Sequence, residues 1–250
     1  MMSGADDAGL RSIIGVLGGM GPLAGAWFMQ RLVVLTPAVD DQDHVPAILV
    51  NDPAVPGRVA AIGQPGAESP LPAMLAGIHR LEAAGATLVA VACNTAHHWH
   101  GQLQAATTLP VLDMIARAAD EVAAVAAGKP VGVLATRGTH AAGLYQRALA
   151  RHGLDALLPD DVVQDRLVLP AIAAVKRGDV AAGNSLAGEA DAAVRAAGAG
   201  AVLIACTELS IAWPDTAWPA ATRASTVDAG DALARAALAH ARGRGTPAAT

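Results

Sequence analysis

Two cysteines, Cys93 and Cys206, are the residues of this chain best suited to acid–base chemistry, and they are its only thiols. Each follows an apolar run, Val89 to Ala92 in one case and Val202 to Ala205 in the other. At neutral pH about a few per cent of an ordinary thiol is thiolate, so one member of such a pair can accept a proton while the other donates one. A carbon that must lose a proton on one face and regain it on the other needs this combination, which is that of a racemase or epimerase.

Other interpretations of the cysteines and their neighbours are weaker. A free cysteine is often only a small buried hydrophobic residue, but the matched contexts of these two favour a shared function. Two cysteines alone form no metal site, and of the nearby His97, His98 and His100 only the first and last share a helical face. We therefore expect no metal at this site.

Positive charges that could hold a carboxylate lie at Arg58, after a loop with two prolines, and at Lys176, at the end of an apolar helix. Arginine holds a carboxylate in a fork and lysine acts as a point charge. A solvated surface charge is the alternative for either residue alone. Thr136 and Thr139 could offer hydroxyl groups, and the backbone around Met20 could offer amides.

The elements that must position these residues are predicted to alternate between strands and helices. Continuous apolar runs bounded by small or polar residues are typical of parallel strands buried on both faces. The strands are expected over 13–17, 47–50, 88–92, 109–112, 131–135 and 202–205, and the helices over 24–35, 70–84, 113–127, 140–152, 167–176, 180–197 and 227–242, with one more running from Asn94 or Thr95 through the histidines. Both cysteines then lie at the carboxyl edge of a parallel sheet, where ligands usually bind.

An internal repeat relates the two cysteine strands. Gly15 recurs as Gly132 and Gly21 as Gly138, both 117 positions later, and Cys93 recurs as Cys206, 113 positions later. Such similar offsets indicate a duplication. The predicted fold is α/β, with two similar domains whose parallel-sheet cores are related by pseudo-twofold symmetry and whose cleft holds the active site. The first domain is expected over 1–113, completed by the C-terminal helix 227–250, and the second over 114–226.

Composition argues against several other functions. The formal net charge is −5 and there is no basic stripe, which disfavours nucleic acid as a partner. The most apolar stretch, residues 13–28, is interrupted by glycines and falls short of a membrane span. The first residues, Met1 to Asp7, are acidic and small, unlike a secretory signal, so we expect a cytoplasmic protein with reduced thiols and no disulfide.

An ordered set of short motifs resembles the cofactor-independent aspartate/glutamate racemase family, in particular its aspartate racemase branch. The motifs are Gly18-Gly19-Met20-Gly21-Pro22, Asn51-Asp52-Pro53 with Pro56 and Arg58, Cys93-Asn94-Thr95-Ala96-His97, Leu134-Ala135-Thr136 with Gly138-Thr139, Lys176-Arg177-Gly178 and Cys206-Thr207-Glu208. The resemblance implies a homodimer that acts on a small amino acid, aspartate or glutamate, without pyridoxal phosphate or metal.

The same resemblance assigns roles to particular residues. Cys93 and Cys206 would be the catalytic acid/base pair, and Arg58 would hold a carboxylate. The substrate would be lined by Met20, Asn94, Thr95, Thr136, Lys176 and Thr207. The family's arginine loop usually reads proline, aspartate, arginine, whereas this chain has Gly57 between Pro56 and Arg58. That change removes a side chain that could orient Arg58.

Three alternative functions stay open at this point. The chain could be a related racemase, isomerase or decarboxylase acting on another carboxylate, or a non-catalytic protein that binds amino acids in the same cleft. The glycine pattern from Gly19 to Ala24 also matches a dinucleotide-binding turn of an oxidoreductase. The acidic residues at the expected distance, Asp40, Asp41 and Asp43, precede the strand that should carry them.

Overall fold

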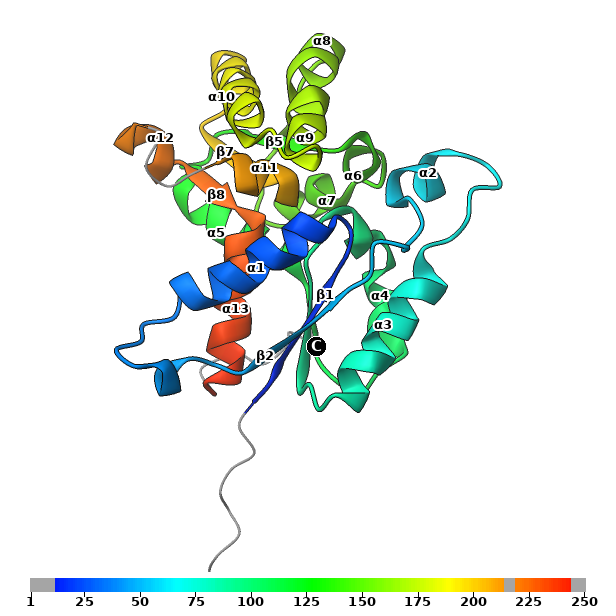
Figure 1. Ribbon diagram of the computed structural model, residues 1–250. Coiled ribbons are helices and arrows are strands. Elements are labelled where there is room, and N and C mark those ends of the chain that lie inside the picture. The colour runs from blue at the N-terminus through cyan, green and yellow to red at the C-terminus, as the bar shows by residue number, and fades with distance from the viewer. Residues whose placement is uncertain (1–11, 214–218, 244–250) are drawn as a thin grey trace, which may run out of the picture.

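The structure is a computed structural model that describes residues 12–213 and 219–243. Two four-stranded parallel sheets form its framework, the first in the lower part of Figure 1 and the second in the upper part. The first sheet has the order β2-β1-β3-β4 and the second the order β6-β5-β7-β8. Their strands are β1 Ile14–Gly18, β2 Ala47–Asn51, β3 Leu88–Val91 and β4 Val111–Leu112, then β5 Val131–Ala135, β6 Ala156–Leu157, β7 Ala201–Ala205 and β8 Thr226–Asp228. The two orders are equivalent strand by strand, which confirms the predicted pair of similar parallel-sheet cores.

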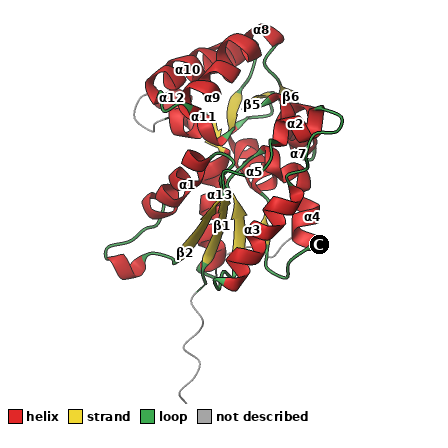
Figure 2. Ribbon diagram, turned by 45° about the vertical axis from the view of Figure 1, so that its right-hand side comes forward, coloured by secondary structure: helices red, strands yellow, loops and turns green. Residues whose placement is uncertain are grey.

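Helices cover both sheets, as Figure 2 shows. Their bounds are α1 Pro22–Val34, α2 Arg58–Gly63, α3 Leu71–Ala83, α4 His100–Ala105, α5 Met114–Val125, α6 Arg137–Ala141, α7 Leu144–Ala150, α8 Asp161–Val163, α9 Leu169–Lys176, α10 Val180–Ala196, α11 Thr207–Ala212, α12 Ala220–Ala224 and α13 Ala229–Ala241. Short 3-10 turns span Asp41–Asp43 and Thr95–Trp99, and a π-helical turn spans Gln164–Val168.

Side chains alternate across each sheet, so the two faces enter different cores. Ile14 and Val16 of β1 and Val131 and Val133 of β5 share one core with α1, α5, α7 and α13. The opposite face of the first sheet packs against α3 and α4, and that of the second packs against α9 and α10. The shared core holds the two sheets in a fixed relation, which is what a site built from both requires.

The predicted strands are confirmed at six places, and two further strands were missed. Strands β6 and β8 have only two and three residues, and they were not distinguished in the sequence from the segments around them. The expected helix over 227–242 was wrong at its start, because Thr226–Asp228 pairs with β7. Helix α13 begins at Ala229 instead, with the Asp228 side chain accepting a hydrogen bond from the backbone N–H of Asp231.

The expected helix over 140–152 was also wrong in its bounds. The Thr136 hydroxyl accepts a hydrogen bond from the Thr139 N–H, so Thr136 caps a short helix, α6, that begins before the expected one. Gly143 then takes a left-handed conformation with φ 62°, which ends that helix and starts α7 in a new direction. Thr136 is thereby held at the carboxyl end of β5.

Helix α13 packs against α1 and β3 of the first half and against α5 and β7 of the second half. Arg31 of α1 makes two short hydrogen bonds, of 2.6 and 2.7 Å, to the Asp231 carboxylate of α13. We propose the division expected from the sequence, with a first domain over 1–113 completed by 227–250 and a second over 114–226. All strands of the first sheet lie within residues 14–112, which supports this division. Val227 and Asp228, at the start of the segment that returns to the first domain, still pair with β7 of the second sheet.

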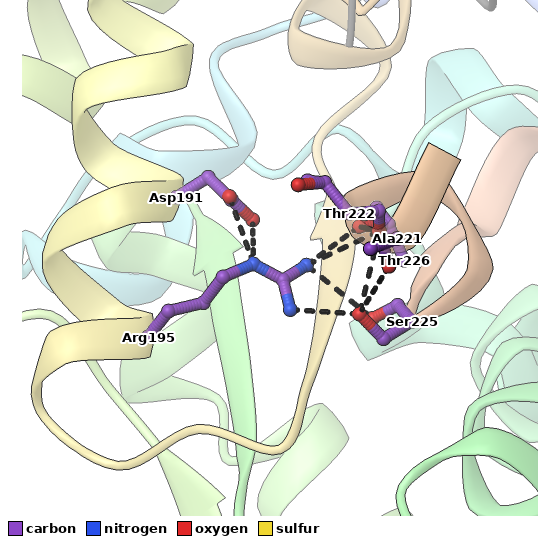
Figure 3. A network of polar contacts seen from close by, with 6 residues as sticks. All are labelled: Asp191, Arg195, Ala221, Thr222, Ser225 and Thr226. Carbon is purple, nitrogen blue, oxygen red and sulfur yellow. Dashed lines mark hydrogen bonds and ion pairs between the residues drawn. The ribbon is translucent and has the colours of Figure 1, made fainter. Parts of the chain in front are cut away.

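A polar network joins α10 to the start of β8, the edge strand of the second sheet (Figure 3). The Arg195 guanidinium of α10 bonds the buried Asp191 carboxylate at 2.9 and 3.0 Å and reaches Ser225 and Thr226 at 2.8 Å beside β8. Because the charge of Asp191 is buried, this arginine is needed to neutralise it.

Across the described residues, no helix has the length and apolar character that would cross a membrane. The acidic first residues, on which the expected cytoplasmic location depends, lie outside the described residues.

Candidate active site

The two cysteines occupy equivalent places at the carboxyl ends of the central strands. Cys93 follows β3 and Cys206 follows β7, where it is the N-cap residue of α11. Both side chains are buried, at 5% and 4% exposure, and both thiols are free. The apolar runs that identified these strands therefore place each sulfur at the carboxyl edge of its sheet.

One cavity of about 190 Å³ lies between the two strand ends. All nine residues expected at the site from the sequence line it, so the structure brings the whole set together. They are Met20, Arg58, Cys93, Asn94, Thr95, Thr136, Lys176, Cys206 and Thr207, joined by Gly57, Val59, Ala60 and Glu208. The lining comes from both halves of the chain, as expected for a cleft between two similar domains.

The loop before α1 brings Met20 to the cavity through Gly19. Gly19 has φ 89°, and a Cβ atom there would lie 2.1 Å from the backbone oxygen of Asp52. Only glycine permits this close approach and this backbone conformation. The Met20 carbonyl oxygen then accepts a 2.7 Å hydrogen bond from Arg58 Nη2.

Backbone carbonyls orient Arg58. Besides Met20, its guanidinium donates to the carbonyl oxygens of Val55 and Pro56 at 3.2 and 3.1 Å. Arg58 begins α2, a helix that was missed because Pro56 and Gly57 were interpreted as a loop. The backbone thus supplies the orientation that Gly57, lacking a carboxylate, cannot.

Helix α2 reaches across the cleft to the second half. It packs against α6, and a Cβ atom on Gly138 would lie 3.1 Å from the Cα atom of Val59. The absence of a side chain at Gly138 allows the two helices to approach, which keeps Arg58 over the cavity.

Threonine hydroxyls join the two halves at the cavity wall. Thr95 Oγ1 lies 3.0 Å from Thr136 Oγ1 and 2.8 Å from Thr139 Oγ1, and the latter two are 3.1 Å apart. Thr139 is buried behind Thr136. The hydroxyls exchange hydrogen bonds with one another, and Thr95 and Thr136 also line the cavity.

Glu208 is the acidic residue of the cavity wall that sequence reasoning missed as a functional residue. The Cys206 thiol donates a hydrogen bond to Glu208 Oε2 over 3.2 Å, and Lys176 Nζ lies 4.0 Å from Glu208 Oε1. The side chain of Glu208 is 7% exposed. Its position two residues after Cys206, in the first turn of a helix, was the available signal.

The electrostatic environments of the two thiols differ. Burial raises the pKa of the Cys93 thiol, and the positive charge of Arg58 opposes that rise. Burial raises the pKa of the Cys206 thiol well above its usual value, and the charge and hydrogen bond of Glu208 raise it further. Cys206 is therefore strongly held in its protonated form, whereas Cys93 has a cation beside it that favours the thiolate.

The histidine cluster lies behind Cys93. His97 Nδ1 is 2.9 Å from the Cys93 carbonyl oxygen, and His97 Nε2 accepts a 3.1 Å hydrogen bond from the Met114 N–H. Burial lowers the pKa of His97, which favours the neutral ring these bonds need. The expected shared face is confirmed, since the rings of His97 and His100 stack with centroids 5.8 Å apart. Among the described residues, no group of three or more His, Cys, Asp or Glu side chains is arranged to hold a metal ion.

The helix expected to run from Asn94 or Thr95 through the histidines was wrong at its start, because α4 begins only at His100. The segment Thr95–Trp99 is a 3-10 turn, and neither side chain caps it. The Asn94 side chain is instead hydrogen-bonded to Tyr145, and Thr95 is hydrogen-bonded to the threonines of the other half.

The chain is similar to known proteins in sequence and in fold. Residues 17–237 match the family model described as Asp/Glu/Hydantoin racemase. An aspartate racemase from Picrophilus torridus has a similar structure, with a TM-score of 0.80 and 31% identity over 92% of this chain and 94% of that one. A broad-specificity amino-acid racemase, RacX, from Bacillus subtilis (strain 168) is 28% identical over 66% of this chain and 71% of its own length.

A glutamate racemase isoform from Bacillus anthracis shares the fold, with a TM-score of 0.66 and 18% identity over 95% of this chain and 85% of that one. The family match covers most of the described residues, and the ordered motifs, the paired sheets and the shared cavity agree with it. The chain therefore belongs to the Asp/Glu/hydantoin racemase family of isomerases.

Proposed function

We propose that this enzyme racemises an acidic amino acid, aspartate in the first place, with Cys93 and Cys206 as the two bases and without a cofactor. The observation that carries the proposal is the position of both thiols in the wall of one small cavity, at equivalent strand ends of the two halves. The similarity to an aspartate racemase over 92% of this chain supports aspartate, and glutamate is the second substrate to test.

The proton transfers balance without a change in the enzyme's composition. A thiolate on one side takes the Cα proton, and the electron pair of that C–H bond is delocalised into the neighbouring carboxylate. The thiol on the other side gives its proton to the same carbon from the opposite face. One thiol and one thiolate remain, with their roles exchanged.

The resting roles follow from the charges beside each sulfur. We assign the thiolate of the pair to Cys93, because Arg58 opposes the rise that burial gives its pKa, and the acid to Cys206, which is hydrogen-bonded to Glu208. In this state the enzyme accepts the enantiomer whose Cα proton faces Cys93. The opposite enantiomer requires the proton to move first from Cys206 to Cys93.

The charged residues of the cavity suit an amino acid with two carboxylates. Arg58 and Lys176 are the cations in its wall, and Thr95, Thr136 and Thr207 add hydroxyls. Glu208 Oε1 is buried and has no hydrogen-bond partner among the described residues. A substrate ammonium group would be a fitting partner for that oxygen, so we assign Glu208 to the amino group.

The test is incubation of the purified protein with L-aspartate or L-glutamate in deuterated water, without added cofactor. Loss of optical rotation and exchange of the Cα proton are followed together. We expect both with the unaltered protein, and a loss of at least about 100-fold in Cys93→Ser and Cys206→Ser, since a positioned acid or base contributes about that much or more.

The same measurements separate the alternatives. Ligand binding without any exchange would favour a binding protein, and consumption of the substrate with release of CO₂ would favour a decarboxylase. Full turnover in either serine variant would contradict the two-thiol mechanism. Activity that survives a chelator and a carbonyl reagent is expected for catalysis by the chain's own residues.

A homodimer is the assembly that the resemblance to the family implies. Light scattering coupled to gel filtration measures the molar mass directly, and a mass near 25.0 kDa would indicate a monomer instead.

A further inference from the structure

Tyr145 is a buried polar residue for which the proposed reaction has no role. It lies in α7, its side chain is fully buried, and it is the only tyrosine of the chain. Its hydroxyl donates a hydrogen bond to Oδ1 of Asn94, which follows Cys93 in the other half of the molecule. A contact between the halves therefore ends on a residue of the cavity wall.

The state of the phenol fixes the direction of this hydrogen bond. Burial raises the pKa of Tyr145 well above its usual value, and the negative charges of Asp113 and Asp228 raise it further. The phenol therefore keeps its proton, and a buried O–H group needs an acceptor. The carbonyl oxygen of Asn94 is that acceptor.

The other end of the Asn94 amide has no such partner. Asn94 is 2% exposed, and its Nδ2 donor has no hydrogen bond within the part of the chain that the structure describes. An unmet buried donor destabilises the protein, so a ligand that accepts its hydrogen bond recovers that cost. Since Asn94 lines the cavity, a carboxylate bound there is the fitting acceptor.

We propose that Tyr145 is a positioning residue that holds the Asn94 amide with its N–H₂ group available to a substrate carboxylate. The inference rests on the proposed function for the identity of the ligand. Without the tyrosine hydroxyl the amide can turn by about half a rotation, which would present the carbonyl oxygen to the carboxylate. Selectivity for an acceptor at this point of the cavity would then be lost.

The test compares Tyr145→Phe, Asn94→Ala and the double variant in binding and turnover of L-aspartate. Tyr145→Phe keeps the buried ring and removes only the hydroxyl. We expect its KM and its dissociation constant to rise by about tenfold, because a hydrogen bond to a charged group contributes about that factor. We expect a smaller change in kcat, because neither thiol is altered.

The double variant distinguishes positioning from a general structural effect. If Tyr145 acts through Asn94, the Tyr145→Phe change has little further effect on binding once Asn94 is alanine. Thr36→Val is a matched control, since it removes another buried hydroxyl, one that donates to the Leu32 carbonyl oxygen in α1. It should leave the dissociation constant unchanged.

A spectroscopic measurement tests the contact without any substrate. Protein labelled with ¹³C at the tyrosine ζ carbon gives one NMR signal from that label, because the chain has a single tyrosine. We expect Asn94→Ala to shift this signal and Thr36→Val to leave it in place.

The outcomes distinguish failure of the role given to Tyr145 from failure of the proposed function. An unchanged dissociation constant in Tyr145→Phe, independent effects in the double variant, or an unshifted tyrosine signal in Asn94→Ala would overturn the inference. If the unaltered protein neither binds nor racemises an acidic amino acid, the proposed function fails, and the NMR comparison alone decides on the contact.

Discussion

The stability of this protein should depend on pH through Asp228, which connects β8 to α13. Burial, together with the charge of Asp231, raises the pKa of Asp228 from 3.8 to about 7. In the unfolded chain this carboxyl titrates near 3.8, so between these values the folded protein keeps a proton that the unfolded chain has lost. The group therefore makes the folded state less stable as pH rises from about 4 to about 7.

The size of the effect follows from the same interval. Each pH unit in which only the folded state holds the proton lowers the free energy of unfolding by about 1.4 kcal/mol. Over the whole interval the loss reaches about 4 kcal/mol at most. Asparagine is neutral and caps a helix as well as aspartate, so Asp228→Asn should remove the pH dependence and keep the cap of α13.

The assay is urea unfolding of the unaltered protein and of Asp228→Asn at several pH values from 4 to 8. Taking the difference between the two proteins cancels the titration of other groups. We expect the variant's advantage in free energy of unfolding to grow with pH by about 2 to 4 kcal/mol. Asp179→Asn, which makes the same change at the cap of α10, is the matched control for loss of a capping carboxylate.

A difference between the two proteins that stays constant with pH would refute this reasoning. It would mean that Asp228 is ionised in the folded state as readily as in the unfolded chain. The result also concerns the site, because Asp228 is hydrogen-bonded to Ser210 of α11, the helix that begins after Cys206.

Three further changes test other parts of the structure. Arg195→Met leaves the buried Asp191 without its partner and should lower the free energy of unfolding by about 3 kcal/mol in urea; a loss below 1 kcal/mol would contradict the buried pair. Arg58→Lys keeps the charge but loses the fork, so kcat/KM for aspartate should fall about tenfold; unchanged kcat/KM would exclude Arg58 as the carboxylate ligand. Gly138→Ala places a Cβ atom 3.1 Å from Val59, so α2 must shift and KM should rise severalfold, whereas an unchanged KM would show that the approach of α2 to α6 is not needed.

The strands that carry the chemistry were predictable because they are buried on both faces. The runs before Cys93 and Cys206 contain only apolar residues, and their equivalent places in the two sheets follow from the repeat. The short strands β6 and β8 could not be found in the same way. Their pairing with β5 and β7 is what makes them strands.

The residues of the cavity were predictable as a set, but their orientation was not. Arg58 is held by three backbone carbonyls, and no sequence motif encodes such contacts. Glu208 was visible beside Cys206, yet its hydrogen bond to the thiol depends on how α11 begins. The contact of Tyr145 with Asn94 joins residues 51 positions apart in different halves, which only the folded chain brings together.

The pattern of isotope incorporation during racemisation tests the two-thiol mechanism most directly. L-Aspartate is converted in deuterated water, and the Cα hydrogen of both enantiomers is measured before equilibrium is reached. If one thiol removes the proton and the other returns a deuteron, the D-aspartate formed carries deuterium while the remaining L-aspartate still carries hydrogen. Early deuterium in both enantiomers, or D-aspartate that keeps the original hydrogen, would contradict the assignment of Cys93 and Cys206 to opposite faces of the substrate.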